Sequence, residues 1–151
     1  MKTLMRCGFN GLVMPLILMK VKEAVLMTLV DTGSNCSYIT RKVLDSMLEE
    51  KCPNLVKLYD VKSSSDTTNG SWDVNQLAII KFRLGRTVYE HKFRVMDCSH
   101  GFDQVEKKYN IQIHFLLGSD FLVSHNMVID YPGQALYTKR VKKVDAKNVE
   151  S

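Results

Sequence analysis

Apolar residues alternate with short polar breaks along most of the chain, a pattern typical of strands joined by tight turns. Near the N-terminus, two apolar runs at 16–21 and 25–31 are separated by a polar pair at 22–23, which predicts a β-hairpin. Two further β-type runs in LAIIKFRLGRTVYEHKFRVMD are separated by a glycine-bearing turn at 84–86. A last hairpin is expected around Tyr131-Pro132-Gly133. Strands therefore dominate the prediction.

Helical spacing is confined to short stretches. After Thr40, which is a suitable N-cap, apolar residues recur at helical spacing at Val43, Leu44, Met47 and Leu48. A second short helical stretch begins with Phe121-Leu122, and the polar connection at 98–110 is expected to hold at most one turn of helix. With seven or eight strands, two short helices and hairpin connections throughout, the expected fold class is all-β and barrel-like.

Two segments of the chain look alike. TLVDTGSN at 28–35 and FLLGSDFL at 115–122 each contain an apolar strand that breaks at a Gly-Ser turn and leads toward a helix. They resemble the two halves of an approximate internal duplication, in which the first half carries an acid, Asp31, that the second lacks. Taken alone, the first segment is equally well explained as a turn, because Asp, Gly, Ser and Asn are the residues that close turns.

Together, the two segments resemble a known family. With an Asn-Gly hairpin between them and MVIDYPGQALY at 127–137, they are similar to the retropepsin-like aspartic proteases, viral and cellular. The resemblance covers residues 14–138 and implies a closed β-barrel acid-protease fold with one or two short helices. It leaves 1–13 as an N-terminal extension and 139–151 as a basic polar tail. The second segment reads Gly-Ser-Asp instead of the Gly-Arg-Asn of many viral enzymes, which is closer to cellular or bacterial members.

The chemistry of this family explains the residue types. Peptide hydrolysis by this route needs two carboxylates that share one proton, because two like charges held so close cannot both ionise. The resemblance implies that Asp31 is the catalytic acid, that Thr32 ties the two catalytic loops together, and that Gly33 permits close backbone approach. The chain has no second D-[ST]-G triplet. The second carboxylate is therefore expected from another copy, in a homodimer that places Asp31 against Asp31.

The resemblance also implies residues that bind a peptide or protein substrate. Ser34 is expected to hydrogen-bond the catalytic carboxylate from outside. The hairpin at 63–75 is expected to form a flap that closes over an extended substrate and pairs with it as an added strand. Asn69 and Gly70 are candidate flap-tip residues. Trp72 is a candidate pocket wall, although an aromatic residue on a strand is more often part of a core.

The second segment is expected to support the site. The resemblance implies that Leu116, Leu117 and Gly118 pack below the acid loop. Asp120 is the only acid near this junction. We interpret it as a cap for the short helix, and not as a catalytic group, because acids are preferred at helix N-termini.

Composition argues against a metal, a cofactor or a nucleic acid as a binding partner. The four cysteines and four histidines are scattered, without the spacing of a zinc site, so no metal or cofactor is expected. The cysteines are interpreted as reduced thiols in a cytoplasmic protein, with disulfides left open. The chain has a formal charge of +5, and much of the excess lies in KRVKKVDAKN. No aromatic stacking platform accompanies this tail, so it is interpreted as solvated, with no nucleic-acid partner.

No membrane association is expected either. No apolar run approaches the roughly 20 residues that span a bilayer. The N-terminal apolar stretch lacks a small-residue cleavage site and is not interpreted as a signal peptide. Three functions therefore remain. The favoured one is an active homodimeric endopeptidase, the second is a retropepsin-like binding or dimerisation module without catalysis, and the third, supported by charge alone, is a nucleic-acid-binding domain.

Overall fold

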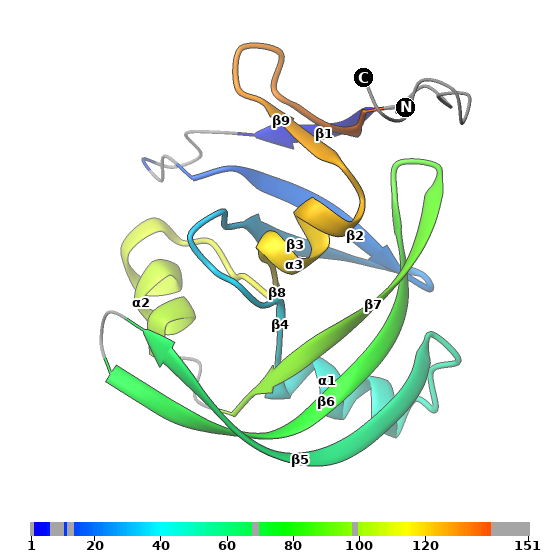
Figure 1. Cartoon of the computed structure of the whole chain (residues 1–151), viewed down its shortest axis with the longest axis vertical. Coiled ribbons are helices and arrows are strands. Elements are labelled where there is room, and N and C mark those ends of the chain that lie inside the picture. The colour runs from blue at the N-terminus through cyan, green and yellow to red at the C-terminus, as the bar shows by residue number, and fades with distance from the viewer. Residues whose placement is uncertain (1, 7–10, 12–13, 68–69, 98–99, 140–151) are drawn as a thin grey trace, which may run out of the picture.

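The computed structural model describes residues 2–6, 11, 14–67, 70–97 and 100–139 (Figure 1). Three helices occur in this part of the chain: α1 (Arg41–Glu49), α2 (His100–Tyr109) and α3 (Ser119–Ser124). The remaining elements are strands: β1 (Lys2–Arg6), β2 (Leu16–Val21), β3 (Ala24–Val30), β4 (Tyr38–Thr40), β5 (Leu55–Thr67), β6 (Gly70–Leu84), β7 (Thr87–Met96), β8 (Phe115–Leu117), β9 (Met127–Asp130) and β10 (Ala135–Thr138).

Six of the described strands form a closed β-barrel. The order around the ring is β6, β7, β4, β8, β3 and β2, and the ring closes where Lys20 of β2 pairs with Arg83 of β6. β5 pairs with β6 outside the ring, while β1, β10 and β9 continue the sheet beyond β2. This arrangement confirms the predicted all-β, barrel-like fold class.

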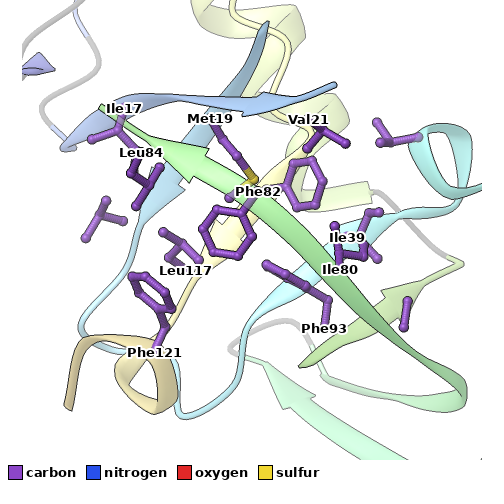
Figure 2. Packing of buried hydrophobic residues seen from close by; sticks show 14 of the residues in the cluster. Ile17, Met19, Val21, Ile39, Ile80, Phe82, Leu84, Phe93, Leu117 and Phe121 are labelled. Carbon is purple, nitrogen blue, oxygen red and sulfur yellow. The ribbon is translucent and has the colours of Figure 1, made fainter. Parts of the chain in front are cut away.

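The barrel encloses one hydrophobic core because alternate residues of each strand face inwards. On β2, Ile17, Met19 and Val21 are at most 3 % exposed and point into the core (Figure 2). Phe82 and Phe93 meet edge to face, with ring centroids 5.6 Å apart. Burying a side chain of this size stabilises the fold by roughly 1.5–3 kcal/mol. Packing of such side chains therefore contributes much of the stability of the barrel.

The two similar segments meet at the centre of the sheet. β3 and β8 are parallel neighbours, with Thr28 aligned to Phe115 and Val30 aligned to Leu117. Both strands therefore end at the same level. The turns that follow them, which carry Asp31 and Gly118, begin side by side.

A second core covers the outer face of the same strands. Tyr38 of β4 and Leu116 of β8 point away from the barrel and pack with Phe102 of α2 and with Ile111 and Ile113. All three residues of β4, and all three of β8, are buried. These short strands are thus covered on both faces, which fixes the position of the turns at their ends.

α2 is a third helix where the sequence analysis expected no more than one turn. That expectation was wrong because the helix has few apolar residues and lies in a strongly polar stretch, so its periodicity is weak. Among its apolar residues, Phe102, Val105 and Tyr109 pack in the second core. Asp103 in the first turn and Lys108 in the last favour the helix through its macrodipole. The prediction of one or two short helices is corrected to three within the described residues.

The structure confirms the predicted turns and the predicted cap of α1, but not the burial of Leu48. Lys22, in the first hairpin turn, and Gly85, in the turn between β6 and β7, have positive φ angles of 54° and 59°. Thr40 caps α1, because its Oγ1 accepts a hydrogen bond from the amide of Val43 at 3.4 Å. Leu48, expected on the apolar face of this helix, is 44 % exposed.

The N-terminal segment takes part in the sheet. Residues 2–6, which the sequence analysis assigned to an extension, form β1 and pair with both β2 and β10 (Figure 1). The predicted basic tail lies outside the described residues from 140 onward. Among the residues that the structure describes, no helix is long and apolar enough to cross a membrane.

Candidate active site

Asp31 stands at the point where β3 leaves the barrel. Its amide donates a hydrogen bond to the carbonyl of Leu117 at 2.9 Å, which ties the acid to the end of β8. Its carbonyl accepts from the amide of Ser34 at 3.2 Å, and its Oδ1 accepts from the amide of Gly33 at 2.9 Å. The carboxylate is thus oriented by its own loop, residues 31–37, hereafter the active-site loop. The residue remains partly exposed.

Gly118 and Ser119 support this loop from the second junction. A Cβ at Gly118 would lie 2.3 Å from the carbonyl oxygen of Cys36, so only glycine allows the two backbones to come this close. The amide of Ser119 donates to the carbonyl of Ser34 at 2.7 Å, and its Oγ donates to the carbonyl of Thr32 at 2.9 Å. The Gly-Ser pair of the second segment thereby positions the backbone on both sides of Gly33.

Asp120 joins the active-site loop to two other elements. Its Oδ1 accepts from Ser37 Oγ at 2.7 Å and from the amide of Phe121 at 2.9 Å. Its Oδ2 lies 3.2 Å from the amide nitrogen of Ser37 and 2.9 Å from Nε2 of His91 on β7. Ser37 Oγ in turn accepts from the amide of Gly118 at 3.0 Å. Residues 37, 91 and 120 thus form one hydrogen-bonded group.

The electrostatics of this group favour an ionised carboxylate. Burial acts to raise the pKa of Asp120, but the hydrogen bonds from His91 and Ser37, the charge of His91 and the amide of Phe121 together outweigh it and lower the pKa below its ordinary value. His125, which packs nearby, has its pKa lowered first by burial and then by the charge of His91. The hydrogen bonds of this group therefore converge on the Asp120 carboxylate.

The structure places the predicted catalytic residues on one exposed loop. Thr32 and Gly33 are exposed, and a Cβ on Gly33 would lie 3.2 Å from Asp31 Oδ1. Leu116 and Leu117 lie on β8 beside the strand that carries Asp31, and Gly118 follows them. Ser34 does not make the expected bond to the carboxylate: its hydroxyl donates to the carbonyl of Cys36 at 2.8 Å. That expectation was wrong because the turn directs the hydroxyl back into its own loop.

The predicted flap corresponds to the outer half of the β5–β6 hairpin. Gly70 is the first residue of β6 and pairs with Thr67, and the backbone of Trp72 pairs with that of Ser65. Asn69 lies outside the described residues, as does the environment of the Trp72 side chain. The roles of these residues in substrate binding remain predictions.

Sequence analysis missed Ser37 and His91 and described Asp120 incompletely. Asp120 does accept the amide of Phe121 in the first turn of α3, but it also binds two side chains from distant parts of the chain. Only the position of Ser37, four residues after the D-T-G triplet, lay near a recognised motif. Within the described residues, no three His, Cys, Asp or Glu side chains come together as a metal site requires.

The comparison with known proteins rests on structure. The sequence matches no protein-family model, and it matches no curated protein. The retroviral protease-like domain of Ddi1 from Leishmania major superposes with a TM-score of 0.56 at 13 % identity, over 85 % of this chain and 90 % of that one. A retropepsin-like aspartic protease from Rickettsia conorii gives 0.50 at 15 % identity, over 90 % and 87 %. The chain therefore has the retropepsin fold.

Proposed function

We propose that two copies of the chain assemble into an aspartic endopeptidase in which Asp31 of one copy faces Asp31 of the other. One observation carries the proposal. In a barrel of retropepsin fold, the D-T-G triplet lies on a loop that is hydrogen-bonded to Leu117 and Ser119, and Asp31 on this loop is partly exposed. Two carboxylates held close together share a proton. One then acts as general base on a water while the other hydrogen-bonds the scissile carbonyl.

The exposure of the loop supports assembly from two chains. Thr32 and Gly33 are exposed in the single chain, where a second loop can approach them. One chain supplies one D-T-G triplet, so a two-fold axis is the simplest way to bring a second carboxylate to the site. In this assembly Thr32 of each copy would tie the two loops together.

The long β5–β6 hairpin supports an extended peptide as the substrate class. β5 has 13 residues and β6 has 15, so the outer half of the hairpin extends well beyond the paired barrel strands. An extended peptide that runs beneath such a hairpin gains backbone hydrogen bonds as an added strand. Closure of the hairpin would also exclude water from the acid pair.

The test is cleavage of a peptide library at mildly acidic pH by the wild-type chain and by Asp31→Asn. Glu49→Gln, an exposed carboxylate on α1, is the matched control. Pepstatin should inhibit cleavage, Asp31→Asn should abolish it, and Glu49→Gln should leave it unchanged. If a verified wild-type dimer cleaves nothing, the proposal fails and the alternative, a retropepsin-like binding or dimerisation module, takes its place.

A further inference from the structure

We propose that His91 and Asp120 are positioning residues for the active-site loop, and that protonation of His91 strengthens their hold on it. The group formed by Ser37, His91 and Asp120 is called the loop latch below. Its catalytic meaning rests on the proposed function, but its effect on the loop does not. The latch is distinct from the acid pair because none of its three side chains is the reacting group.

The first argument is the donor set around Asp120. Its two oxygens receive a hydroxyl, two backbone amides and an imidazole nitrogen, all between 2.7 and 3.2 Å. An ionised carboxylate accepts hydrogen bonds only, so it satisfies all four donors at once. These donors come from the active-site loop, α3 and β7, which are far apart in the sequence. A single carboxylate therefore fixes the loop against the barrel.

The second argument is the continuity of the bonds towards Asp31. Ser37 is 1 % exposed, and its hydroxyl both donates to Asp120 and accepts from the amide of Gly118. Gly118 is followed by Ser119, which binds the carbonyls of Thr32 and Ser34 on either side of Gly33. If Ser37 loses its hydrogen bonds, Gly118 and Ser119 are held less firmly. These two residues in turn position the backbone next to Asp31.

The third argument is the setting of His91. Its side chain is 13 % exposed and lies between aromatic rings, with centroids of Phe93 and Phe121 at 5.5 and 5.3 Å. Two titratable groups interact with it: Asp120, through the hydrogen bond, and His125, on which its charge acts. In such a poorly hydrated setting, a bond between imidazolium and carboxylate is stronger than one from a neutral ring.

His125, the neighbouring histidine, is harder to protonate than an ordinary histidine. Burial, followed by the charge of His91, lowers the pKa of His125, so His125 stays neutral to lower pH than an ordinary histidine. Asp120 keeps its charge to lower pH than an ordinary carboxyl, because its pKa is lowered. The Asp120 carboxylate is therefore available as an acceptor at mildly acidic pH, which is the range expected for a shared-proton acid pair.

The experiment uses three full-length variants. His91→Phe keeps the ring but removes the donor. His91→Gln keeps a neutral donor but cannot be protonated. His125→Phe is the matched control, since it alters a histidine of the same aromatic cluster whose ring packs against Tyr89 and Phe121. Hydrogen-exchange protection factors of the Ser37 and Gly118 amides, measured by NMR at pH 5 and pH 8, report on the latch whether or not the chain cleaves peptides.

We expect His91→Phe to lower both protection factors roughly tenfold at pH 5 and about threefold at pH 8, as for a lost charge-assisted and a lost neutral bond. His91→Gln should match the wild type at pH 8 and lack its additional protection at pH 5. The kcat should follow the same order, with KM nearly constant. His125→Phe should behave as the wild type does.

Unchanged protection of Ser37 and Gly118 in His91→Phe would overturn the proposal. Equal loss at both pH values, with no rescue by His91→Gln, would also overturn it, because the effect would then come from packing. If protection changes as expected but the wild type cleaves no peptide, the latch stands and the proposed function fails.

Discussion

Gly118 and Cys36 approach each other so closely that a Cβ on Gly118 would lie 2.3 Å from the Cys36 carbonyl oxygen and 2.7 Å from that of Ser34. Both obstacles are backbone atoms of the active-site loop. The backbone at Gly118 and the active-site loop are therefore in direct contact. A change that pushes them apart must displace the loop residues next to Asp31.

Gly118→Ala should consequently destabilise the chain by about 2–4 kcal/mol and remove peptide cleavage, because the loop must shift to make room. Gly133→Ala is the matched control. Its Cβ would meet the Asp130 carboxylate at 2.4 Å, but that is a side chain on an exposed turn, which is able to rotate away. Urea unfolding of both variants provides the comparison, and equal losses of stability would contradict this account of Gly118.

Asp120→Asn should lower stability in a pH-dependent way. The folded-state pKa of Asp120 is lowered, so its contribution is present above the ordinary carboxyl pKa and is lost as pH falls through the folded value. The variant should be less stable than the wild type by about 1–3 kcal/mol at pH 6, the loss expected for hydrogen bonds to a charged group, and the difference should shrink towards pH 2.5.

Urea unfolding at pH 6, 4 and 2.5 measures that difference. Asp97→Asn serves as a control: Asp97 pairs with Arg41 at 2.6 Å but is 41 % exposed, so its loss should cost less than about 1 kcal/mol. A constant difference between Asp120→Asn and the wild type across the whole range would show that the charge of Asp120 does not matter.

Specific activity should fall on dilution. Each proposed site takes one Asp31 from each chain, so the active fraction follows the equilibrium between monomer and dimer. Rate measurements over a dilution series, paired with analytical ultracentrifugation at the same concentrations, test this. An active monomer would rule out the two-chain site.

The pH dependence of cleavage should be bell-shaped and weighted to the acid side. In the proposed dimer two carboxylates lie close together and share one proton, and the shared-proton mechanism loses activity when rising pH removes that proton. The rate constant for one good peptide is measured at fixed ionic strength, with dimer content checked at each pH. A flat profile into the alkaline range, with the dimer intact, would exclude the shared-proton mechanism.

Local sequence signals predicted much of the barrel. The run at 16–21 matches β2 in full because its alternation and the following turn act over a few residues. α2 was not predicted because its few apolar residues lie in a polar stretch. These residues pack against the outer face of β4 and β8, which the local sequence does not reveal. The loop latch was beyond reach for a related reason: residues 37, 91 and 120 are brought together by the barrel alone.

β6 is at once part of the predicted flap and part of the barrel wall. It runs without interruption from Gly70 to Leu84, is buried at Val74 (0 % exposed), and pairs with β7 in the barrel wall from Leu77 onward. Val74 pairs with Ser63, and a register shift between Asp60 and Ser63 interrupts the ladder at that point. Strand pairs bend at such irregularities. If the hairpin closes over a peptide as proposed, we expect it to bend at this irregularity, so a substitution of the buried Val74 should change how readily the hairpin opens.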